Sequence, residues 1–333
     1  MIVVITGASA GVGRATARAF AEDGWDVALL ARGNAGLEGA AEDVRRAGSR
    51  ALALEVDVAD AGAVEAAADR IEHELGPIDA WVNDAMESVF ASVTETTADE
   101  YRRVTEVNYL GYVHGTLAAL RRMKPRDRGV IVQIGSALAY RSIPLQSAYC
   151  ASKHAIVGFT DSLRCELIHD GSHVRLTAVH LPAMNTPQFG WVRSRLPDRA
   201  QPVPPIFEPE VAARAILHAA RHPRRELFVG GPTLLAVWGQ KFVPNVLDWY
   251  LGRTGYAAQQ TDEPRPDRPD NLDAPVDERE DRGAHGRFAN RSKERSIQLE
   301  LSLHRGLVAT AAAAAVSAVV GLRMLTANGG RDS

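Results

Sequence analysis

A tyrosine and a lysine stand four residues apart, at Tyr149 and Lys153. In a helix this spacing places both side chains on one face. The pKa of a free tyrosine is near ~10, so its phenol is a poor acid or base at neutral pH. A neighbouring ammonium favours the phenolate and brings that pKa closer to the working range. The pair could therefore move a proton, but the same spacing also occurs by chance on exposed helices. The residues upstream are needed to decide between these two interpretations.

Upstream of this pair lies a glycine-rich turn, Thr6-Gly-Ala-Ser-Ala-Gly-Val-Gly13. It follows a short apolar run, residues 2–5, typical of a buried strand, and it precedes a predicted helix at 14–21. Glycines let the backbone turn tightly and approach a pyrophosphate, which then sits at the positive end of the helix. Strand, turn and helix in this order are the context that a dinucleotide-binding turn needs. An ordinary strand-to-helix turn is the alternative.

The chain alternates between apolar runs and helical patterns as far as about residue 180. This alternation predicts an α/β fold, a Rossmann-type doubly wound parallel sheet, in a single domain with a C-terminal helical extension. In such sheets ligands bind at the carboxyl ends of the strands. Predicted strands cover residues 2–5, 25–31, 51–56, 78–82, 129–134, 174–179 and 226–230.

Two polar side chains follow the second and third predicted strands. Arg32 stands where a dinucleotide fold faces the adenosine ribose, and a guanidinium there suits a 2′-phosphate. NADP(H) is therefore favoured over NAD(H), with a solvated loop arginine as the alternative. Asp57 could accept a hydrogen bond from an adenine amino group, or it could cap the next helix, which begins near Ala61.

Two further polar residues precede the tyrosine–lysine pair. Asn108 lies in a predicted helix, 101–120, although asparagine is a poor helix former. Surface exposure is the ordinary explanation, and a hydrogen bond that bends or hydrates the helix is the other. Ser136 ends the fifth predicted strand, thirteen residues before Tyr149, at the edge of the sheet where ligands bind.

In combination, order and spacing, these motifs resemble those of the short-chain dehydrogenase/reductase family. The matching features are the glycine turn at 6–13, Asn108, Ser136 and Tyr149-x-x-x-Lys153. The resemblance runs from residue 1 to about residue 230, roughly two thirds of the chain. It implies hydride exchange between a nicotinamide cofactor and an alcohol or carbonyl compound.

The resemblance also implies a role for each matching residue. Tyr149 would be the general acid and base, and Ser136 would hold the substrate oxygen by a hydrogen bond. Lys153 would lower the tyrosine pKa and bind the nicotinamide ribose, while Asn108 would hold a water that feeds the proton relay. An alkoxide formed by hydride transfer does need a proton donor and a second hydrogen-bond partner. The implied cofactor-binding residues are Gly7, Ser9, Gly11, Val12, Gly13, Arg32, Asp57, Val58, Asn83, Ala85, Tyr149, Lys153 and Thr186.

Two stretches depart from the family's common pattern. Asn83-Asp84-Ala85-Met86 stands where Asn-Asn-Ala-Gly is usual, so Asp84 adds charge and Met86 adds bulk. Pro182-Ala183 replaces the usual Pro-Gly, and alanine restricts the backbone more than glycine does. We expect these changes to affect the packing around the cofactor and the path of the nicotinamide loop, and to leave the catalytic set intact.

Composition excludes several classes of function. The chain has 333 residues and a formal net charge of -3, which offers no electrostatic footprint for nucleic acid. No Cys/His spacing of the zinc type is present, so no metal site is expected. Two cysteines in a chain of this length indicate a reducing compartment. The first residues lack the basic and apolar regions of a signal peptide, so we expect a cytoplasmic catalytic domain that is not secreted.

The Rossmann domain is assigned to residues 1–232, and three segments follow it. Residues 233–258 form a helical extension that is expected to pack on the sheet, with pairing to another subunit or a membrane surface as alternatives. Residues 259–300 are polar and proline-rich, which predicts a linker or a loosely wrapped tail. Residues 301–326 form an alanine-rich apolar helix, and its part 307–325 is either a membrane anchor or a helix that packs on a partner.

The sequence thus predicts an NADP(H)-dependent oxidoreductase that acts on a small, apolar carbonyl or alcohol. By the resemblance, it would work as a homodimer or tetramer. The region 187–209, with Phe189, Trp191 and Phe207, would cover the substrate or form an ordinary loop. A catalytically silent cofactor sensor or scaffold is the alternative, because fold does not fix function. A sugar-nucleotide epimerase of the related extended family is disfavoured by the glycine spacing, and the substrate cannot be read from the sequence.

Overall fold

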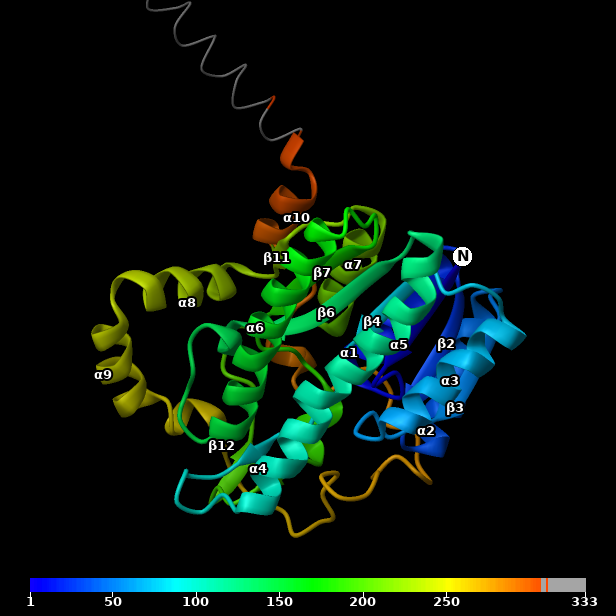
Figure 1. Cartoon of the computed structure of the whole chain (residues 1–333). Coiled ribbons are helices and arrows are strands. Elements are labelled where there is room, and N and C mark those ends of the chain that lie inside the picture. Colours follow the sequence, from blue (N-terminus) through cyan, green and yellow to red (C-terminus); the bar gives the residue numbers. More distant parts are fainter. Residues whose placement is uncertain (307–309, 311–333) are drawn as a thin grey trace, which may run out of the picture. The chain divides into compact units, whose positions relative to one another are not determined.

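A parallel sheet of seven strands forms the centre of the first of two compact units, residues 1–296. The computed structural model describes residues 1–306 and 310. The strand order is β11-β7-β6-β4-β1-β2-β3, which confirms the predicted doubly wound, Rossmann-type sheet (Figure 1). Its strands are β1 (Ile2–Thr6), β2 (Asp26–Ala31), β3 (Ala51–Glu55), β4 (Ala80–Asn83), β6 (Val130–Ser136), β7 (Arg175–Leu181) and β11 (Glu226–Phe228).

Helices cover both faces of this sheet. On one face α1 packs against α2 and α7, and on the other α3 packs against α5 while α4 packs against α6. Their bounds are α1 (Gly11–Glu22), α2 (Asn34–Arg46), α3 (Ala61–Glu74), α4 (Ala98–Thr105), α5 (Gly111–Arg126), α6 (Ser147–His169) and α7 (Pro209–Arg221). Because both faces are covered, the strands are apolar throughout, and all five residues of β1 are buried.

Three short strand pairs join segments that are distant in sequence. One is parallel, between β5 (Val89–Phe90) and β8 (Arg193–Ser194). Another is antiparallel, between β9 (Asp198–Ala200) and β12 (Gln260–Pro264), and the third is parallel, between β10 (Ile206–Phe207) and β13 (Ser292–Lys293). The last two pairs attach residues 260–293 to the segment between β7 and α7. Short helical turns are η1 (Glu106–Leu110), η2 (Ala137–Ala139), η3 (Pro187–Gly190), η4 (Ala257–Gln259) and η5 (Ala289–Arg291).

The expectation that residues 233–258 pack on the sheet is wrong for most of their apolar side chains. The segment forms two helices, α8 (Gly231–Phe242) and α9 (Pro244–Thr254), which extend away from the sheet (Figure 1). Pro244 divides them, as expected of a proline inside a helical pattern. The side chains of Leu235, Trp238, Phe242, Val246, Trp249 and Tyr250 are each at least half exposed. Thr233 is buried in the first turn of α8, and Arg141 donates hydrogen bonds to Gln240 in α8 (2.8 Å) and Asp248 in α9 (2.7 Å).

The predicted linker, 259–300, is instead folded onto the first unit as far as residue 296. Leu272, Phe288 and Gln259 are almost completely buried, and the charged residues between them find partners on the Rossmann core. The second unit begins at Ile297 with α10 (Ile297–Leu303). The segment 307–325, where an anchor was considered, lies outside the described residues except for Thr310. Within the described part of the chain, no helix is long and apolar enough to cross a membrane.

Candidate active site

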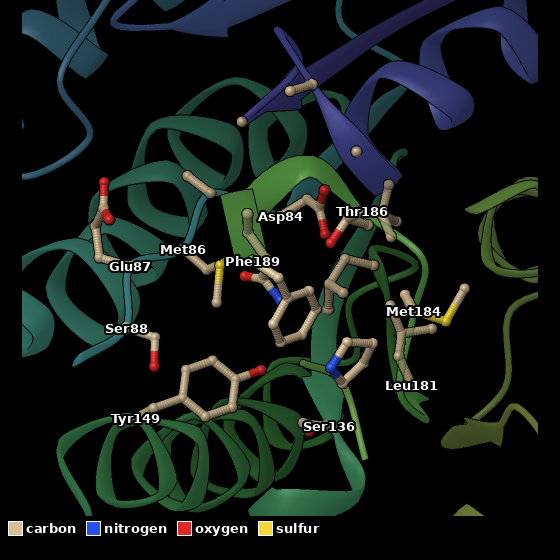
Figure 2. Close-up of a pocket in the computed structure, with 18 of the residues that line it drawn as sticks. Asp84, Met86, Glu87, Ser88, Ser136, Tyr149, Leu181, Met184, Thr186 and Phe189 are labelled. Atoms are coloured by element: carbon tan, nitrogen blue, oxygen red, sulfur yellow. The ribbon is translucent and has the colours of Figure 1, made fainter. Parts of the chain in front are cut away.

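A cavity of about 410 Å³ opens at the carboxyl ends of the central strands. Its walls include the residues that directly follow β1, β2, β3 and β4 and those that end β6 and β7. The lining includes Gly7 and Arg32, which follow β1 and β2, together with Ser136, Tyr149 and Thr186. Figure 2 shows Tyr149 reaching into this cavity from α6, with Ser136 beside it and Asp84 and Thr186 across from it. One cavity therefore combines the glycine turn with the two hydroxyl groups of Ser136 and Tyr149.

The glycine turn fits closely against residues 84 and 85, which directly follow β4, the neighbour of β1 in the sheet. Gly7 has a φ of +69°, which favours glycine, and a Cβ at Gly13 would lie 2.2 Å from the carbonyl oxygen of Gly7. The Thr6 hydroxyl accepts hydrogen bonds from the backbone amides of Asp84 (3.0 Å) and Ala85 (3.1 Å). Gly13 therefore serves packing rather than lining the cavity, and Thr6 fixes the loop after β4.

Ser136 and Tyr149 bring two hydroxyl groups together at the substrate end. The Ser136 hydroxyl accepts a hydrogen bond from the backbone amide of Leu138 at 3.1 Å, which orients it at the end of β6. Burial raises the pKa of Tyr149, and its hydrogen bond with Ser136 acts in the opposite direction. A protonated phenol is therefore the resting form of Tyr149, ready to donate.

Lys153 lies below Tyr149 on the same face of α6, as the spacing predicts. Its ammonium donates hydrogen bonds to the carbonyl oxygen of Ile134 (2.8 Å) and the hydroxyl of Tyr112 (3.0 Å). It lies 5.6 Å from the centroid of the Tyr149 ring. Burial lowers the pKa of Lys153, and the charge of Asp84 opposes this. Because burial of the phenol holds the pKa of Tyr149 above its usual range, the lowering of that pKa by Lys153 stays a prediction.

Asn108 is completely buried in η1, a π-helical turn between α4 and α5. Its side-chain oxygen accepts from the backbone amide of Glu87 (2.7 Å), and its nitrogen donates to the carbonyl oxygen of Glu87 (2.9 Å) and the Ser152 hydroxyl (3.0 Å). Of the two explanations for this asparagine, exposure is wrong and a hydrogen bond at a helix bend is confirmed. The side chain joins the loop after β4 to the helix that carries Tyr149. Its role in holding a water stays a prediction.

Two residues that were predicted to contact the adenosine part of a cofactor have unexpected partners. Arg32 forms an ion pair with buried Glu87, whose pKa burial raises to about 8 against the opposing charges of Arg32 and Arg103. Asp57 lines the cavity but accepts hydrogen bonds from Arg103 (2.6 Å) and the backbone amide of Ala59 (3.0 Å). It does not cap α3, because Asp60 occupies that position and accepts from the first turn.

Asn83, like Gly13, is a predicted cofactor residue that does not line the cavity. Its amide is fully buried and donates to Gln133 (2.9 Å) and Thr116 (3.2 Å), and its oxygen accepts from Trp81 (2.9 Å). This network holds β4 against α5 and β6, so Asn83 shapes the site from below. The remaining cofactor residues proposed from the sequence line the cavity; they are Gly7, Ser9, Gly11, Val12, Arg32, Asp57, Val58, Ala85, Tyr149, Lys153 and Thr186.

Several lining residues were not identified from the sequence. Glu87 and Ser88 come from the loop after β4, next to the unusual Asp84 and Met86. A second group comes from far along the chain, in the segment expected to be a linker; it comprises Asn271, Pro275, Val276 and Asp277. A proline-rich, charged stretch carries no periodic signal that would place it over a cavity. Phe189 and Trp191 do line the cavity, whereas Phe207 is buried in β10.

Comparison with known proteins gives consistent results. A family model described as short chain dehydrogenase matches residues 1–196. The uncharacterized oxidoreductase YxnA of Bacillus subtilis is 32% identical over 266 residues, 79% of this chain and 74% of that protein. An uncharacterized oxidoreductase of Mycobacterium tuberculosis is 35% identical over 231 residues, 67% of this chain and 65% of that protein. The crystal structure of an alcohol dehydrogenase from Thermococcus sibiricus, complexed with 5-hydroxy-NADP, matches with a TM-score of 0.60 and 27% identity, covering 68% of this chain and 95% of that one.

Proposed function

Because the chain belongs to the short-chain dehydrogenase/reductase family of oxidoreductases, we propose that it interconverts an alcohol and a carbonyl compound with a nicotinamide cofactor. The observation that carries this proposal is the pair of hydroxyls from Ser136 and Tyr149 in the same cavity that the glycine turn lines. Neither the hydroxyl pair nor the glycine turn would indicate the reaction by itself.

The residues present fit a dinucleotide. Gly7 and Gly11 both have positive φ values at the N-terminus of α1, where the backbone can approach a pyrophosphate. Close to Gly11, the hydroxyl oxygen of Thr186 is buried and has no hydrogen-bond partner among the described residues. A carboxamide of a nicotinamide would supply such a partner. Buried polar groups are normally satisfied, so this oxygen marks a ligand position.

The chain's own residues would manage the proton and the substrate oxygen. The bound cofactor would supply or accept the hydride. Ser136 would donate a hydrogen bond to the substrate oxygen, and Tyr149 would transfer its phenolic proton to that oxygen as the carbonyl becomes an alcohol. Lys153 would stabilise the phenolate that remains, because its ammonium lies on the same helix face beneath the ring.

Cofactor preference and substrate class follow from the two ends of the cavity. Arg32, directly after β2, supports NADP(H) over NAD(H), as does the NADP derivative in the Thermococcus sibiricus structure. An apolar substrate is supported by the side chains around Tyr149, which include Leu138, Phe189 and Trp191. Pairing of two copies through the helices that carry Asn108 and Tyr149 stays a prediction from the family resemblance.

The test uses purified full-length protein and a panel of ketones, aldehydes and alcohols, with turnover followed by nicotinamide absorbance. We expect turnover of at least one apolar member, and a loss of about 10²-fold or more in Tyr149→Phe with unchanged nucleotide affinity. Tyr101→Phe is the matched control, since its hydroxyl contacts Ser147 at the start of α6 but not the cavity. Nucleotide binding without turnover of any substrate, with no effect of Tyr149→Phe, would favour the cofactor-sensor alternative.

A further inference from the structure

Residues 270–283, here called the strap, cross the adenosine end of the cavity. The strap contributes Asn271, Pro275, Val276 and Asp277 to the cavity wall. Its backbone is hydrogen-bonded to the Rossmann core at separate points: Gly283 accepts from the Gly11 amide (3.2 Å), Asp277 from the Gly36 amide (3.1 Å) and Glu278 from the Ala35 amide (3.3 Å). It thus binds both the glycine turn and the start of α2.

Ion pairs and one buried side chain hold the strap in place. Arg14 in α1, itself buried, pairs with Asp281. Arg193 pairs with Asp270 (2.8 Å) and Asp273 (2.6 Å) at the other end. Between these anchors, the Leu272 side chain is buried against the apolar residues around Val104. The strap is therefore a specifically packed element and not a solvated tail.

Two strap carboxylates lie at the start of α2. Glu278 accepts a hydrogen bond from the Asn34 amide, the first residue of the helix, at 3.1 Å. Asp277 is buried against the preceding turn, and a Cβ at Gly33 would lie 1.8 Å from its carboxylate oxygen. The N-terminus of a helix is a position where anions bind. In this structure that position is filled by the chain's own negative charges.

The strap also engages Arg32, the residue that supports a cofactor 2′-phosphate. The Arg32 guanidinium donates hydrogen bonds to the backbone carbonyls of Asn271 and Leu272, in addition to its ion pair with Glu87. The closed strap thus holds the guanidinium of Arg32 and places two carboxylates against the residues that directly follow it, Gly33 and Asn34. A ribose with a free 2′-hydroxyl adds no charge here, but a 2′-phosphate adds about two negative charges.

We propose that the strap is an acidic gate that selects the cofactor, with Glu278 and Asp277 occupying the place of a 2′-phosphate. NADP(H) must displace these carboxylates and free Arg32, whereas NAD(H) binds beneath the closed strap. The choice between the two cofactors is then set by how firmly residues 270–283 are held. This inference rests on the proposed dinucleotide function, and it assigns the selectivity of that site to a segment outside the family core.

Binding experiments test the gate without any need for turnover. Dissociation constants of the full chain are measured by calorimetry for NADP⁺, NAD⁺, adenosine 2′,5′-bisphosphate and 5′-AMP. In Asp277→Asn/Glu278→Gln we expect affinity for the two 2′-phosphorylated ligands to rise about fivefold or more, since each removed charge weakens a close repulsion. Affinity for NAD⁺ and 5′-AMP should change by less than about twofold. The matched control is Glu280→Gln, two residues along the strap, whose carboxylate pairs with Arg282.

Hydrogen exchange of the strap amides gives a second readout. We expect NADP⁺ to speed exchange in peptides covering 270–283 and NAD⁺ to leave it unchanged or slow it. Equal effects of the double variant on all four ligands, or equal protection of the strap by both dinucleotides, would overturn the gate and leave the oxidoreductase proposal standing. Failure of every variant to bind any of the ligands would remove both proposals.

Discussion

Replacement of Asn108 by alanine tests how the site is held together. The Asn108 side chain is fully buried and satisfies both the amide and the carbonyl of Glu87, at 2.7 and 2.9 Å. Alanine would leave these two buried backbone groups without protein partners. An unsatisfied buried group costs about 1–3 kcal/mol, so Asn108→Ala should lower the free energy of unfolding by about 2–5 kcal/mol after partial relaxation.

The assay is urea unfolding, supported by thermal unfolding, of the full chain. For a unit of this size, such a loss corresponds to a fall in Tm of roughly 3–8 °C. Cofactor affinity should fall as well, because Glu87 and Ser88 line the cavity and would lose their attachment to the helix behind them. Ser152→Ala removes only the third partner of Asn108 and should cost about 1 kcal/mol or less.

Thr105→Val serves as the control, since it removes an exposed hydrogen bond within the same helix, from the Thr105 hydroxyl to the Tyr101 carbonyl. Its effect should stay within about 0.5 kcal/mol. If Asn108→Ala costs no more than this control, the π-helical turn does not depend on Asn108. The claim that this side chain fixes the loop after β4 would then be refuted.

Two further predictions concern titrating groups. The negative charge of Asp84 raises the pKa of both Tyr149 and Lys153. Alcohol oxidation needs a deprotonated Tyr149 as base, so Asp84→Asn should move the limb where kcat/KM rises with pH to lower pH, and an unmoved limb would contradict the coupling. Glu226 accepts a hydrogen bond from His180, which lowers its pKa from 4.5 to about 2. Its stabilising contribution is therefore complete above about pH 4.5 and is lost as the pH falls toward about 2. Across that window Glu226→Gln should lose less stability than the unchanged chain in urea unfolding, and parallel losses would count against the assignment.

Local patterns were enough to predict the elements that position the chemistry. Alternation of strands and helices gave the sheet, and the end of each strand gave the edge where Ser136 and the glycine turn meet. The spacing of Tyr149 and Lys153 gave their shared helix face. Asn108 was recognisable as unusual because it conflicts with helix propensity, which is the kind of local conflict that a functional site produces.

What could not be predicted depends on contacts between distant residues. Arg32 was expected to be open to a phosphate, but its partners Asn271 and Leu272 lie about 240 residues further along the chain. The strap has the composition of a solvated linker, and only the positions of Arg14 and Arg193 show that its acids are paired. For α8 and α9 the error was the opposite one: their apolar side chains were predicted to be packed but are exposed. Helical periodicity cannot tell a side chain that packs on the sheet from one that faces solvent.

Asp277 in the strap fits closely against Gly33 and Gly36 at the start of α2. A Cβ at either glycine would lie 1.8 Å or 2.4 Å from an oxygen of that carboxylate, so neither position can gain a side chain while the aspartate stays in place. A side chain at either position would therefore have to displace the Asp277 carboxylate. The size of the residues at the start of α2 and the path of the acidic segment across them thus constrain each other, although about 240 residues separate them in the chain.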